Sequence, residues 1–80
     1  MAQTQFFPIV SSNLHAAAYD RDWKELVVRF KSGTAYKYQD VPASLWSEFK
    51  KLFDGKRGSA GSFFAKHIKI FASERIEDWQ

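Results

Sequence analysis

The chain has 80 residues, a net charge of +3 and no cysteine. A chain of this length forms one domain with a small core, and without cysteine it has neither disulfides nor thiolate metal sites. No apolar run approaches the roughly 18 residues of a membrane-spanning helix, and no basic signal-peptide segment opens the chain. We therefore expect a cytoplasmic protein without a membrane partner, in which a partly disordered tail (residues 1–10) precedes a domain over residues 11–72.

The first half of the chain predicts strands. Residues 13–19 predict a first strand, in which Leu14, Ala16 and Ala18 share one face. Residues 24–30 predict the second and clearest strand, because apolar side chains occupy every second position.

A three-residue loop, residues 31–33, connects the second strand to a third, and its final glycine would adopt a positive φ. This loop places Val28 opposite Tyr36, so Tyr36 and Tyr38 share the face of Val28 while Lys37 points to the other face. If the Val28 face is the core, the two tyrosines are largely buried, with their hydroxyls at the rim. A two-residue loop would reverse this arrangement.

The second half predicts two helices. Residues 41–42 mark the start of the first helix and Gly55 its end, and Ser62 would cap a short second helix. The apolar positions at helical spacing are Leu45, Trp46, Phe49, Leu52 and Phe53 in the first helix and Phe64, Ile68 and Phe71 in the second. Residues 73–80 read as an acidic tail. The predicted fold is α+β: a three-stranded antiparallel β-meander followed by two helices packed on one face.

Several short motifs follow one another in a characteristic order. They are Ser12-Asn13, Tyr19-Asp20, Phe30-Lys31-Ser32-Gly33, Tyr36-Lys37-Tyr38, Val41-Pro42, Phe63-Phe64 and His67-Ile68-Lys69. In this order they resemble the KTSC domain, a module found at the C-terminus of some lysyl-tRNA synthetases and as small stand-alone proteins. The resemblance implies that Tyr36, Lys37 and Tyr38 form the family's central motif. It implies no enzymatic activity, and RNA binding is the function suggested for the family.

Positive charge is concentrated in residues 50–69, where six basic residues and one acidic residue give +5, against −2 for the rest of the chain. Such a segment favours an anionic partner. The predicted nucleic-acid-binding residues are Lys50, Lys51, Lys56, Arg57, Lys66, His67 and Lys69. The glycine-rich loop, residues 55–61, leads into a helix N-terminus, where free N–H groups attract phosphate. This loop lacks the P-loop pattern, and its Gly-x-x-Gly stretch matches that of KH domains without the KH context.

Catalytic and metal-binding patterns are absent from the sequence. His15 and His67 have no further ligands at metal-binding spacing. Ser62 and His67 are five residues apart, which is not one helical face, so they form no nucleophile and base pair. We therefore predict a non-enzyme without metal or cofactor.

Two functions remain open at this point. The preferred one is a small non-catalytic module that binds nucleic acid, RNA ahead of DNA, with Tyr36 and Tyr38 either structural or stacking on bases. The alternative is a protein-protein interaction or regulatory module with exposed aromatic side chains, because a small core has limited room to bury them. The surplus aromatic residues are Phe6, Phe7, Trp23 and Trp79. The sequence leaves the oligomeric state and any base preference open.

Overall fold

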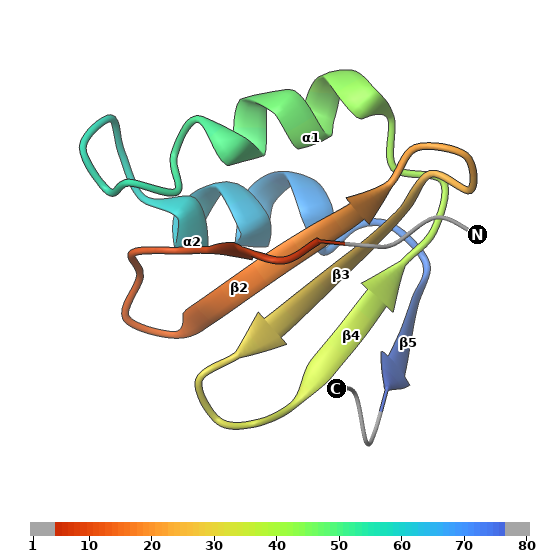
Figure 1. Cartoon of the computed structure of the whole chain (residues 1–80), viewed down its shortest axis with the longest axis horizontal. Coiled ribbons are helices and arrows are strands. Elements are labelled where there is room, and N and C mark those ends of the chain that lie inside the picture. The colour runs from red at the N-terminus through yellow and green to blue at the C-terminus, as the bar shows by residue number, and fades with distance from the viewer. Residues whose placement is uncertain (1–4, 77–80) are drawn as a thin grey trace.

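Two short helical segments cover one face of an antiparallel sheet in this α+β protein (Figure 1). The structure is a computed structural model that describes residues 5–76. Its elements are β1 (Phe7–Pro8), β2 (Leu14–Asp20), β3 (Glu25–Phe30), β4 (Ala35–Tyr38), α1 (Ala43–Lys50), α2 (Ala60–Phe63), the π-helical turn η1 (Phe64–Ile68) and β5 (Ser73–Ile76). We call the sheet face beneath the helices the covered face and the other the open face.

The sheet has five strands in the order β1-β2-β3-β4-β5, so the prediction of three strands was wrong. The two additional strands, β1 and β5, lie in the segments that the sequence assigned to tails. The first has two residues, one of them a proline, and the second is mostly polar and exposed. Neither carries the apolar alternation that identifies a strand locally. They form strands because each pairs with an edge strand of the central three-stranded meander. This pairing depends on the tertiary structure and not on a local sequence pattern.

The predicted register of β3 and β4 is confirmed. Val28 pairs with Tyr36 and Leu26 with Tyr38, while Lys37 pairs with Val27 on the open face. The loop between these strands has the predicted three residues, and its glycine has a φ of 99°. Turn geometry alone therefore fixed which face each tyrosine occupies.

The face assignment of β2 was wrong, because this strand contains an irregularity. Leu14 pairs with Phe30, but Ala17 pairs with Val28, and the register shifts between Leu14 and Ala16. One extra residue in β2 reverses the face on which each following side chain of the strand lies. Leu14 therefore shares the covered face with Ala17 rather than with Ala16. The three successive alanines include no polar side chain that would mark the solvent-facing position, so the shift could not be predicted from the sequence.

The helices pack through aromatic side chains. Phe49 of α1 is fully buried and stacks on Phe63 of α2, with ring centroids 5.6 Å apart. Phe53 meets Phe49 edge to face at 4.9 Å. Of the predicted core residues, Leu26, Val28, Phe49 and Phe64 are buried and Phe30, Leu45 and Leu52 are half-buried.

The ends of the helices differ from the prediction. α1 ends at Lys50, and Gly55, with a φ of 74°, follows the turns beyond it. The second helix begins after Ser59, whose Oγ accepts a hydrogen bond from the backbone N–H of Ser62 at 3.1 Å. Ser62 therefore donates to the cap and is not itself the cap.

Candidate nucleic-acid interface

The central Tyr-Lys-Tyr motif divides between the two faces of the sheet. Lys37 lies on the open face with its Nζ 3.9 Å from Glu25 Oε2 and 4.0 Å from Glu74 Oε1. Arg29 shares this face, and its Cζ lies 5.8 Å from the centre of the Phe6 ring. The predicted placement of Lys37 is confirmed, and its charge is matched by two carboxylates that link β3, β4 and β5.

The two tyrosines lie on the covered face, as predicted, but they differ in burial. Tyr38 is 4% exposed and meets Phe64 edge to face at 5.5 Å. Burial raises the pKa of Tyr38 to about 12, with a smaller contribution from the nearby Tyr36. Tyr36 is only half-buried. Tyr38 is thus a core residue, whereas Tyr36 keeps part of its ring accessible.

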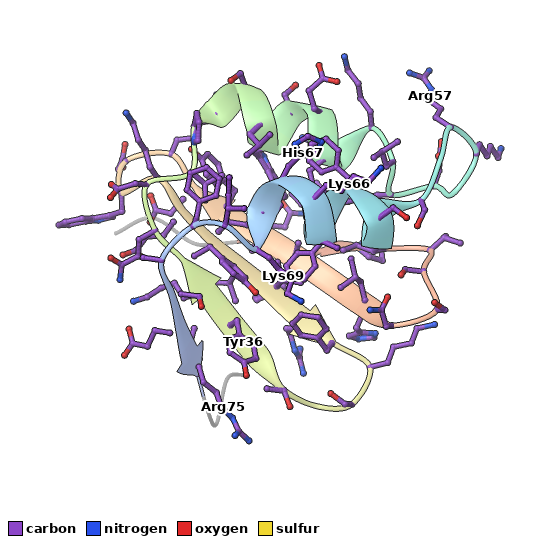
Figure 2. All side chains as sticks on the ribbon, turned by 180° about the vertical axis from the view of Figure 1, so that it is seen from behind. Tyr36, Arg57, Lys66, His67, Lys69 and Arg75 are labelled. Atoms are coloured by element: carbon purple, nitrogen blue, oxygen red, sulfur yellow. The ribbon has the colours of Figure 1, made fainter. Side chains whose placement is uncertain are left out.

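A pocket of about 420 Å³ opens beside Tyr36, between η1 and strands β3 and β4. The side chains that define its character are Asn13, Phe30, Tyr36, Phe64, Lys69 and Ser73. Phe64 is buried at its base, while Lys69 and Ser73 are exposed and lie at its mouth. Figure 2 shows Lys69 reaching from η1 toward the part of the sheet that carries Tyr36.

Of the seven predicted nucleic-acid-binding residues, Lys69 alone lines this pocket. Lys66, His67 and Lys69 are exposed on and just beyond η1, and Arg57 projects from the glycine-rich loop (Figure 2). Within residues 5–76, the ammonium and guanidinium groups of Lys56, Arg57, Lys66 and Lys69 form no ion pair. These four charges are therefore available to an anionic ligand.

Two of the predicted residues lie elsewhere. Lys50 places its Nζ 4.8 Å from the ring centre of Phe7 on β1 and 5.7 Å from that of Trp46. Lys51 pairs with Glu48 at 3.4 Å. Since η1 packs over β3 and β4 while Lys50 packs over β1, the fold does not bring Lys50 to the pocket.

Three residues near the pocket were missed from the sequence. Arg75 pairs with Tyr36 across β4 and β5, so it lies on the covered face, and Ser73 lines the pocket mouth. Both were assigned to a tail, and no local pattern marks them. Asn13 belongs to a recognised motif, but only the folded chain places it beside Gly61.

The described part of the chain has no cluster of three His, Asp or Glu side chains suited to a metal ion. His15 is exposed on β2, and the His67 ring lies 4.7 Å from that of Phe63. In the same residues, no helix is both long and apolar enough to cross a membrane.

Comparison with known proteins shows the family. The model of the KTSC domain matches residues 10–70. A crystal structure of a KTSC domain protein from Yersinia pestis is similar to this one, with a TM-score of 0.80 and 30% sequence identity, covering 92% of this chain and 99% of that chain. A search of curated proteins finds no significant match. These comparisons give no support to a lysyl-tRNA synthetase connection. Because the family model matches most of the chain and the structures agree, this chain belongs to the KTSC domain family.

Proposed function

We propose that the protein is a non-catalytic module that binds single-stranded nucleic acid through the side formed by the glycine-rich loop, η1 and the pocket beside Tyr36. The observation that carries the proposal is an aromatic pocket lined by Lys69, together with three further basic side chains on η1 and the glycine-rich loop before α2, Lys56, Arg57 and Lys66, none of the four having an ion pair within residues 5–76. Basic groups that neutralise phosphates supply most sequence-independent affinity. Aromatic side chains add sequence-tolerant stacking for unpaired bases.

The open face supports this choice by contrast. There, Lys37 is matched by Glu25 and Glu74, and Arg29 lies against Phe6. A polyanion gains less from cations that already have carboxylate partners. Charge accessibility therefore favours the helical side as the binding surface.

The expected form of the ligand is an unpaired strand. A pocket between a helix and two strands can admit a base only when that base is not stacked in a duplex. RNA is placed ahead of DNA because of the family resemblance described above, and both are included in the test.

The test is a titration with mixed-sequence single-stranded RNA and DNA, followed by residue-level chemical shifts. We expect the largest shifts at residues 56–69 and at Tyr36, with smaller changes at Lys37 and Glu25 on the open face. Shifts confined to the open face would place the site elsewhere. If neither nucleic acid shifts any resonance at low salt, the proposal is wrong.

A specific observation favours the alternative, a protein interaction. Trp23 is 72% exposed and Ile70 is 76% exposed. Both lie near the connection from β4 to α1. The N–H of Val41 donates to the carbonyl of Lys24, the residue after Trp23, and the N–H of Gln39 donates to the carbonyl of Ala72, two residues after Ile70. Exposed aromatic and aliphatic side chains are common at protein interfaces. A partner that uses this end would be lost with Trp23→Ser, which leaves the basic side unchanged.

The other aromatic residues that the sequence suggested for a protein interface give less support to a protein partner. Phe7 packs on Trp46 with ring centroids 6.0 Å apart, and Phe6 lies under Arg29. Trp79 lies outside the described residues. Trp23 is therefore the main support for a protein partner among the four aromatics.

A further inference from the structure

We infer that the pocket between η1 and strands β3 and β4 receives one unpaired base of the bound strand, with Lys69 at the adjoining phosphate. The inference rests on the proposed function and deepens it. It specifies a stacking site on a surface whose affinity otherwise comes from charge.

The size and the layering of the pocket suit a single base. Its volume of about 420 Å³ lies in the range of about 300–1,000 Å³ typical of ligand pockets. Buried Tyr38 and Phe64 form its inner part, and exposed Ala65, Lys69 and Ser73 form its mouth. A nucleotide has an aromatic base and a polar sugar and phosphate. A base in this pocket would contact aromatic carbon inside, and its sugar and phosphate would meet polar atoms at the mouth.

The aromatic wall is held in place by the core. Phe30 meets Tyr36 edge to face at 6.0 Å and Phe64 edge to face at 5.4 Å. Phe64 in turn meets Tyr38 at 5.5 Å. Because the buried rings fix the half-buried ones, little conformational entropy is lost when a base packs against Tyr36.

Polar groups converge on the same pocket. Asn13 is fixed on the side of α2, where its Oδ1 accepts a hydrogen bond from Ser11 Oγ at 3.1 Å. Gly61 leaves room for this close approach, because a Cβ there would lie 3.2 Å from that oxygen, which is tighter than an ordinary contact. An amide in this position suits the donor and acceptor edge of a base. Lys69, which has no ion pair within residues 5–76, supplies the charge for a phosphate at the mouth.

The experiment measures the contribution of the bases to affinity separately from that of the phosphate backbone. A short single-stranded RNA and an abasic strand of equal length carry the same phosphates, and only the first has bases. Their dissociation constants are measured for the wild type, for Ala65→Leu, which narrows the pocket mouth, and for Ala43→Leu, the same change at an exposed position of α1. Stacking of one base predicts that the wild type binds the RNA at least about fivefold more tightly than the abasic strand.

Ala65→Leu should lose this preference while binding the abasic strand as the wild type does, and Ala43→Leu should keep the preference. Equal binding of the two strands by the wild type would overturn the inference and leave the proposed function standing. An unchanged preference in Ala65→Leu would likewise place stacking outside the pocket. If neither strand binds at low salt, the proposed function and the inference both fall.

Discussion

At the scale of single residues, the central motif has one role per position. Tyr38 is buried against Phe64 in the inner part of the pocket, Lys37 links three strands through two carboxylates, and Tyr36 is the half-buried ring that a ligand in the pocket can reach. Two of the three positions are therefore structural. We expect ligand-induced changes in this motif to be concentrated at Tyr36.

The raised pKa of Tyr38 predicts a specific alkaline instability. Burial, with a smaller effect of Tyr36, raises this pKa from 10.0 to about 12, so the folded state holds the phenol proton more tightly than the unfolded chain. The resulting stability is fully present below pH 10 and is lost as the pH rises from 10 toward 12. Tyr38→Phe keeps the ring without the titrating hydroxyl, so its free energy of unfolding should fall less steeply over this range. Denaturant unfolding at several pH values measures both curves, and parallel curves would contradict the assignment.

Phe49 is the residue whose truncation should cost most. It is fully buried and meets Phe53 and Phe63 at 4.9 and 5.6 Å. Phe49→Ala should lower the free energy of unfolding by about 3–5 kcal/mol, which is a large share of the stability of a small domain. Trp23→Ala removes a larger but 72% exposed ring and serves as the control. Similar losses in urea unfolding for both variants would mean that the core is not organised around Phe49.

At the scale of elements, local signals identified some features and missed others. The β3–β4 hairpin was predictable because its loop length and glycine set the register over four residues. The β2 irregularity was not predictable, because a run of alanines carries no facing pattern. β1 and β5 could not be predicted for a different reason: their pairing depends on sheet edges that exist only after folding.

The start of α2 gives a test at this scale. Ser59 Oγ accepts a hydrogen bond from the N–H of Ser62, so Ser59→Ala removes a cap and should cost about 1 kcal/mol of unfolding free energy. Ser62→Ala is the matched control: it alters a serine inside the helix, keeps the donating N–H and should change stability much less. Unfolding by denaturant compares the two. A greater loss in Ser62→Ala would restore the sequence-based assignment of the cap.

At the scale of the whole molecule, the two sides differ in how their charges are satisfied. Lys37 on the open face has two carboxylate partners, whereas Lys66 on η1 and Lys69 at the pocket mouth have none within residues 5–76. The sequence identified the basic segment, but its charge run also included Lys50, which packs over Phe7 instead. The way the helices cross the sheet determines which charged side chains lie close together. A count of charges along the sequence does not predict this.

The salt dependence of single-stranded RNA binding tests the central claim most directly. Each neutralised phosphate contributes about −0.7 to the slope of log K against log salt, so three or four contacts predict a slope of about −2 to −3. Lys66→Ala with Lys69→Ala should make the slope shallower by about 1 to 1.5. Lys50→Ala with Lys51→Ala removes the same charge at the C-terminal end of α1 and should leave the slope close to that of the wild type. A slope near zero for the wild type, or an equal change in the two double variants, would contradict a binding surface beside the pocket.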